Sequence, residues 1–181
     1  MSMTPTGTAD VPSAFCLSGA TAADRMSAVP VKPRSLVLSD ALHRQLSAEA
    51  RAAYPNECCG LLEGVRHDDT IEVLALRPTR NLADAPDAFE IDPAEHIRLL
   101  RTLRGTGREI VGCYHSHPNG EARPSARDRA QAQDRNFVWL ICAAPLLRGF
   151  VWTGPDFAEI ELTSARREVA SRSAASGRSQ D

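Results

Sequence analysis

The sequence predicts an α/β (α+β) fold, with a single mixed β-sheet flanked by helices. Short apolar segments typical of strands alternate along the chain with longer segments whose apolar residues recur at helical spacing. Such alternation favours one sheet with helices packed against it. The length of 181 residues is typical of a single domain with a sizeable core.

The first part of the domain is predicted to contain a helix and a β-hairpin. Ser39 is a typical N-cap, and the apolar residues that follow it recur every four positions, which predicts an amphipathic helix. Pro55 ends this helix, because a proline disfavours helical geometry in the residue before it. The expected elements are a strand at 36–38, the helix at 40–53, a strand at 58–65, a turn at 66–69 and a strand at 71–77.

The second part is predicted to add two helices and the remaining strands. Asp92 and Pro93 are typical of a helix start, since proline fits the first helical turn, and Gly105 and Gly107 mark the end of that helix. The expected elements are a short strand at 88–91, a helix at 93–103, a strand at 109–115, a helix at 125–133 and strands at 137–143, 148–153 and 158–162.

Both ends of the chain differ in composition from the part between them. Residues 1–33 are mostly small and polar without a sustained period, which predicts a disordered N-terminal segment. Residues 164–181 are rich in Arg and Ser, and we expect any helix there to end near residue 171. The predicted domain therefore spans 34–163.

Composition excludes several function classes. A net charge of −2 provides no basic field for nucleic acid. No apolar run approaches the ~20 residues of a membrane helix, and the N-terminus lacks the pattern of a secretory signal. The five cysteines are odd in number and follow no disulfide framework. We therefore expect a cytoplasmic protein with reduced thiols, and the sequence does not indicate its oligomeric state.

The segment 111–128, VGCYHSHPNGEARPSARD, carries the strongest functional signal. His115 and His117 are one residue apart on a predicted strand, so both imidazoles lie on one face. Ser125 and Asp128 follow at i and i+3, at the start of a predicted helix. Two imidazoles and one carboxylate form a three-ligand set that leaves the fourth zinc position open for water. This arrangement is typical of a catalytic zinc site rather than a structural one.

Each half of this pattern also has a simpler explanation. Ser-x-x-Asp is a common helix cap, in which Ser125 accepts a bond from a free N–H group and Asp128 is favourable at the positive helix end. His-x-His by itself can be two surface histidines. The two halves together, framed by Pro118 and Pro124, favour the metal site.

This pattern resembles the signature of the JAMM/MPN+ metalloprotease family, which includes deubiquitinase-type isopeptidases. The shared features are His-x-His-Pro, six intervening residues and then Ser-x-x-Asp, and the resemblance covers roughly residues 35–163. The family also has a glutamate upstream, and Glu57 in the segment 54–64 takes that position. The match extends through Asn81, 89–93 and 137–143. The resemblance implies a cytidine-deaminase-like fold with one zinc ion at one end of the sheet, and the chain lacks large insertions.

The resemblance also implies a role for each site residue. His115, His117 and Asp128 would bind zinc, which lowers the pKa of its bound water toward ~7. Glu57 would act as general acid and base, and Ser125 would donate to the developing oxyanion.

Two other residues compete for these roles on their position in the sequence. Glu63 is a rival base, but we expect it to be solvated at a strand end. Cys113 lies on the same face of the predicted strand as the two histidines, yet deeper in the sheet, so we expect it in the core. We expect Cys59 to be a small buried residue beside the site.

The implied activity is hydrolysis of the peptide or isopeptide bond after the C-terminal Gly-Gly of a ubiquitin-like or sulfur-carrier protein. The compactness of the chain favours sulfur carriers, because linkage-specific relatives carry insertions. Two alternatives remain open, namely a non-catalytic MPN scaffold and a RadC-like DNA-associated protein. A nucleotide deaminase would need His-x-Glu and Pro-Cys-x-x-Cys motifs, which the sequence lacks.

Overall fold

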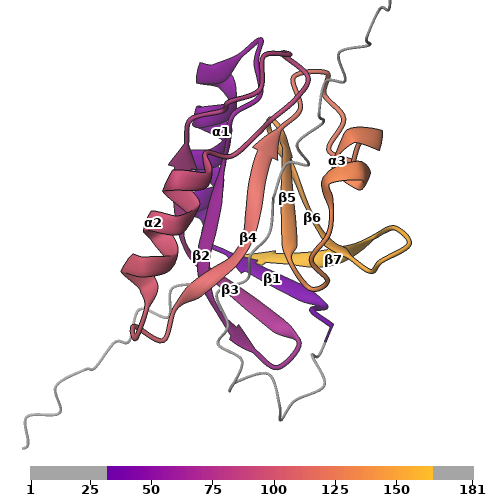
Figure 1. The fold of residues 1–181 in the computed structure, drawn as a ribbon. Coiled ribbons are helices and arrows are strands. Elements are labelled where there is room, and N and C mark those ends of the chain that lie inside the picture. The colour runs from indigo at the N-terminus through magenta and orange to yellow at the C-terminus, as the bar shows by residue number, and fades with distance from the viewer. Residues whose placement is uncertain (1–31, 165–181) are drawn as a thin grey trace, which may run out of the picture.

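The computed structural model describes residues 32–164, which form seven strands and three helices (Figure 1). In chain order these elements are β1 (Ser35–Leu38), α1 (Asp40–Ala53), β2 (Cys59–His67), β3 (Thr70–Thr79), α2 (Pro93–Leu103), β4 (Glu109–Ser116), α3 (Ala126–Gln131), β5 (Val138–Ala143), β6 (Leu146–Trp152) and β7 (Phe157–Ser164).

The strands form one mixed sheet in the order β1-β3-β2-β4-β5-β6-β7. β4 pairs parallel with β5, while β2 is antiparallel to both β3 and β4. This confirms the predicted fold class. The sheet also closes on itself, because β1 pairs parallel with both β3 and β7. Closure was not predicted, since it depends on register between strands at opposite ends of the domain.

The core has two apolar layers, one on each face of the central strands. Alternation along a strand sends neighbouring residues to opposite faces, so Leu62 and Tyr114 pack on the side of α1, while Leu61 and Cys113 pack on the side of α2. Cys59 and Cys113 are both buried, as predicted. Apolar residues thus cover both faces of the central strands β2, β4 and β5.

Several predicted boundaries agree closely with the structure. Helix α1 has the predicted bounds, and its N-cap Ser39 accepts a hydrogen bond from the Leu42 N–H. Helix α2 begins at Pro93, with Asp92 as its cap. Among residues 32–164 no helix is both long and apolar enough to cross a membrane.

Other expectations need correction. The short strand expected at 88–91 is absent, and only an isolated bridge joins Ile91 to Asn81, because the Asn81 side chain takes up the backbone groups of this segment. Helix α3 is shorter than expected, with Ser125 as its N-cap rather than its first residue. Strand β7 continues to Ser164, and the expected disordered segment and C-terminal tail otherwise lie outside the described residues.

The expectation that Glu63 is solvated was wrong. The residue is fully buried, and its carboxylate accepts hydrogen bonds from Arg77 Nε at 2.7 Å and Arg108 Nη1 at 2.9 Å. The strand registers on both sides of β2 shift at this residue, and such irregularities redirect a side chain. Burial alone would raise the pKa of Glu63, but the hydrogen bonds from Arg108 and Arg77 outweigh it and lower the pKa. Glu63 is thus a structural carboxylate.

Replacing Glu63 with glutamine is expected to lower the free energy of unfolding at pH 7 by roughly 1–3 kcal/mol, since both arginines lose a charged partner. The stabilisation from the carboxylate is present above the unfolded-state pKa of about 4.3 and is lost as the pH falls through the lowered folded-state pKa. Urea unfolding should therefore show a difference between wild type and Glu63→Gln that shrinks in strong acid.

The exposed pair of Glu109 with Arg66 provides a matched control. Glu109→Gln is expected to change the unfolding free energy by less than about 1 kcal/mol, because surface ion pairs contribute little. An equal loss for Glu63→Gln at pH 7 and in strong acid would contradict the assignment of Glu63 as a paired carboxylate.

Candidate metal centre

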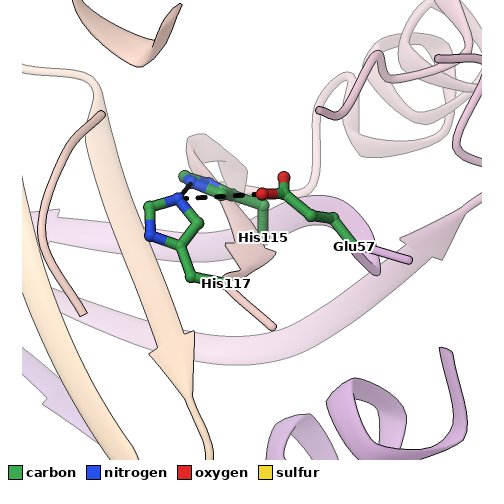
Figure 2. Close-up of side chains that lie close together, drawn as sticks. All are labelled: Glu57, His115 and His117. Atoms are coloured by element: carbon green, nitrogen blue, oxygen red, sulfur yellow. Dashed lines mark hydrogen bonds and ion pairs between the residues drawn. The ribbon is translucent and has the colours of Figure 1, made fainter. Parts of the chain in front are cut away.

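Two histidines converge at the C-terminal end of β4. His115 lies on the strand and His117 just beyond it, where the His117 N–H still bonds to the Cys142 carbonyl at 2.8 Å. This extended path keeps both imidazoles on one side, and their Nε2 atoms lie 3.0 Å apart (Figure 2). The His-x-His spacing therefore has the predicted geometric effect.

Helix α3 brings a carboxylate to the same point. Asp128 Oδ1 lies 3.3 Å from His115 Nε2, and Asp128 Oδ2 lies 3.5 Å from His117 Nε2. Asp128 is also part of a capping box, in which its N–H bonds to Ser125 Oγ at 3.1 Å and its Oδ2 accepts from the Ser125 N–H. The helix cap and the metal site are thus compatible, because the cap fixes the orientation of Asp128.

Glu57 approaches the histidines from the segment just before β2. Its Oε1 lies 3.9 Å from His117 Nε2, and the side chain is buried (Figure 2). The N–H of the neighbouring residue Cys58 donates a hydrogen bond to Ser116 Oγ at 2.9 Å. Ser116 lies between the two histidines in the sequence. This link across two strands sets the position of Glu57 relative to His115 and His117.

Asn81 holds the loop that borders Glu57. Its Nδ2 donates to the carbonyls of Glu57 and Ala88, and its Oδ1 accepts from the N–H groups of Ala83 and Glu90. The same loop carries Phe89, which stacks on the His115 ring with centroids 4.2 Å apart. Sequence reasoning gave no role to Asn81 or Phe89, although both lie in the segments that matched the JAMM/MPN+ signature.

Burial and mutual charge determine the protonation of the site. Burial raises the pKa of Glu57 to about 7, against the opposing effect of His117. Burial lowers the pKa of His115. For Asp128, burial is outweighed by hydrogen bonds with both histidines, so its pKa falls well below the ordinary range. These hydrogen bonds therefore favour the anionic form of Asp128 beside the two imidazoles.

The orientation of His117 favours metal binding. Its Nδ1 lies 2.7 Å from the Glu121 carbonyl oxygen, which can only accept, so Nδ1 carries a proton and, in the neutral ring, Nε2 is the atom with the lone pair that faces the site. For His115 the Nε2 also faces the site, while its buried Nδ1 has no hydrogen-bond partner among the described residues. Two imidazole nitrogens thus point at one position.

The separations of these donor atoms fit a tetrahedral metal. Ligands at zinc distances of ~2.0–2.2 Å lie roughly 3.3–3.6 Å apart at tetrahedral angles. The observed separations between His115, His117 and Asp128 are 3.0, 3.3 and 3.5 Å. Glu57 forms an alternative group with the two histidines, in which the donor atoms all lie within 4.8 Å of one another. The shorter distances favour Asp128 as the third ligand and leave Glu57 one position further out.

All five residues singled out in the sequence, including Ser125, therefore meet at one end of the sheet. A mixed sheet with two histidines, an aspartate and a buried glutamate at this position defines a JAMM/MPN-type domain. Residues 39–153 match the family described as prokaryotic homologs of the JAB domain. The chain belongs to this family.

Three relatives with similar sequences are named as a desampylase, a conjugate cleaving protease and a peptidase. The chain is 38% identical over 110 residues to a desampylase of Haloferax volcanii, covering 60% of this chain and 78% of that protein. It is 36% identical over 109 residues to a probable TtuB-protein conjugate cleaving protease of Thermus thermophilus, covering 60% and 68%. A CysO-cysteine peptidase of Mycobacterium tuberculosis is 32% identical over 93 residues, covering 51% of this chain and 62% of that protein.

A solved structure agrees with these matches. The solution structure of a Desulfitobacterium hafniense protein superimposes with a TM-score of 0.65 at 34% identity, covering 71% of this chain and 92% of that one. The predicted JAMM/MPN-type fold and the predicted class, a hydrolase of the peptidase type, are thereby confirmed. The roles of the individual site residues stay predictions.

Proposed function

We propose that this chain is a zinc-dependent peptidase or isopeptidase that hydrolyses the bond after the C-terminal Gly-Gly of a ubiquitin-like or sulfur-carrier protein. The observation that carries the proposal is the convergence of His115, His117 and Asp128, with the Glu57 carboxylate 3.9 Å from His117 Nε2. The names of the relatives, a CysO-cysteine peptidase and a protein-conjugate cleaving protease, support a protein adduct as the substrate.

His115, His117 and Asp128 are the residues that would hold the metal. Nitrogen and carboxylate donors at these separations suit zinc, which when bound lowers the pKa of a coordinated water toward ~7 and polarises a carbonyl group. The second carboxylate, Glu57, has no need to be a ligand and is free for proton transfer.

Glu57 would act as the general base and then as the general acid. In this reaction the oxygen of water joins the glycine carbonyl carbon, and the bond from that carbon to the leaving nitrogen breaks. Glu57 takes a proton from the attacking water and delivers it to the leaving nitrogen, so the products are a carboxylate and an amine. Its place just before β2, held through Asn81 and Cys58, keeps its carboxylate beside the histidines.

Ser125 would stabilise the charge that develops on the carbonyl oxygen. Its oxygen accepts from the Asp128 N–H, which occupies a lone pair but leaves the hydroxyl proton for another acceptor. A hydroxyl fixed in this way at the helix start is suited to donate to an oxyanion. A cytoplasmic location and the absence of nucleic-acid partners stay predictions from the sequence.

The test is intact mass spectrometry of a sulfur-carrier protein extended beyond its C-terminal Gly-Gly and incubated with zinc-loaded wild type. We expect a product that ends in Gly-Gly and that is absent when Glu57→Gln replaces the wild type. Intact substrate after incubation with a fully zinc-loaded enzyme would contradict this substrate class.

A further inference from the structure

A pocket of about 350 Å³ lies beside His117, on the side of the sheet that packs against α1. The last turn of α1 contributes Arg51, and Tyr54 follows it. The end of β5 contributes Cys142 and Ala144 follows, while the loop after β4 contributes His117 and Gly120. One of the proposed metal ligands is therefore part of the pocket wall.

Arg51 gives this pocket its charge. Apart from His117, it is the only basic residue that lines the pocket, and neither Asp nor Glu lines it. Within residues 32–164 no carboxylate lies at ion-pair distance from the Arg51 guanidinium. Tyr54 beside it is exposed over 69% of its surface. The pocket thus combines small apolar walls with one unpaired cation.

The size of the pocket limits what it can hold. Its volume is near the lower end of the ~300–1,000 Å³ range of small-molecule pockets, so it can take a residue but not a folded domain. On the acyl side of the scissile bond the proposed substrate has two glycines, which have no side chains to fill a pocket next to His117. The residue on the amine side of the bond is the part of the substrate that can fill it.

We propose that this pocket receives the leaving residue and that Arg51 binds its α-carboxylate, so the enzyme favours adducts that carry a single amino acid after Gly-Gly. This proposal rests on the function proposed above. A guanidinium presents paired donors that match both oxygens of a carboxylate, and such charged hydrogen bonds are strong and specific. An acceptor lysine within a protein has its carboxyl group in a peptide bond and offers no such partner.

The test uses three substrates made from one carrier protein. The first carries one alanine after Gly-Gly with a free carboxylate, the second carries the same alanine as its amide, and the third is joined to the lysine side chain of a peptide blocked at both ends. For zinc-loaded wild type we expect kcat/KM for the free acid to exceed the other two by about 10- to 100-fold. We expect the difference mainly in KM, because Arg51 would bind ground state and transition state alike.

Two arginines of α1 provide the matched variants. Arg51→Gln is expected to bring the ratio of free acid to amide close to one, and Arg51→Lys to restore part of it. Arg44→Gln removes the same charge from an exposed position on the same helix that does not line the pocket, and it should leave the ratio unchanged.

The outcomes separate this proposal from the function on which it rests. Cleavage of all three substrates at equal rates, or a preference for the free acid that survives in Arg51→Gln, would overturn the role of Arg51 while leaving the peptidase intact. Cleavage of none of them by the zinc-loaded wild type would overturn both. A preference that is lost in Arg51→Gln and kept in Arg44→Gln would support both.

Discussion

Replacing His117 with alanine is expected to remove metal binding and cleavage together. Its Nε2 lies 3.0 Å from that of His115 and 3.5 Å from Asp128 Oδ2, so the substitution takes away one of three proposed ligands. Loss of a partner that merely orients a ligand already costs 10- to 100-fold in affinity or activity, so loss of the ligand itself should cost about 100-fold or more. Metal content per chain by elemental analysis, measured alongside cleavage of the carrier substrate, checks the result.

His67 is the matched control for this substitution. Its side chain is 64% exposed at the end of β2 opposite to Glu57, and His67→Ala should keep both the metal and the activity. Circular dichroism of His117→Ala before and after metal addition would separate loss of the ligand from loss of the fold. Retention of one metal per chain in a folded His117→Ala protein would mean that His117 is not a ligand.

Replacing Glu57 with glutamine is expected to keep the metal and lose turnover. Glutamine has nearly the same shape as glutamate but does not carry protons between water and the leaving nitrogen. General acid–base catalysis contributes about 10²- to 10⁴-fold, so kcat should fall within that range. Because Glu57 lies 3.9 Å from His117 Nε2, further than either Asp128 oxygen from its histidine, the metal content should stay close to that of wild type.

Metal content and kcat, measured together, also decide which of the two carboxylates, Glu57 or Asp128, is the third metal ligand. If Glu57 were the third ligand, Glu57→Gln would lower the metal content, and Asp128→Asn would not. Glu161→Gln, a change of the same kind at an exposed position on β7, should alter neither the metal content nor kcat. Full activity of the Glu57→Gln variant would mean that Glu57 is not the general base.

The parts of the structure that followed from sequence are those set by local geometry. The capped helix α1 has its predicted bounds, because Ser39, the apolar spacing and Pro55 act within a few residues of one another. His115 and His117 share a face because side chains alternate along any strand. Ser125 and Asp128 come together because one helical turn joins positions i and i+3.

Where expectations failed, the deciding contact lies outside the local sequence pattern, with a partner seven to 45 residues away. Glu63 looked like a solvated residue at a strand end, and the shifted registers on both sides of β2, together with Arg77 and Arg108, make it a buried one. The strand expected at 88–91 is replaced by a loop folded around the Asn81 side chain. A local pattern contains no signal for such partners.

The sequence by itself determined the class of the fold and the set of residues that meet at the candidate metal centre, because short-range periodicity and a spaced motif carry that information. Only the tertiary structure decided how the sheet closes through β1, how Glu57 is held by Asn81 and by the link from Cys58 to Ser116, and that Arg51 lines a pocket beside His117. These features depend on packing and register between segments tens of residues apart, and such contacts form only when the whole domain folds.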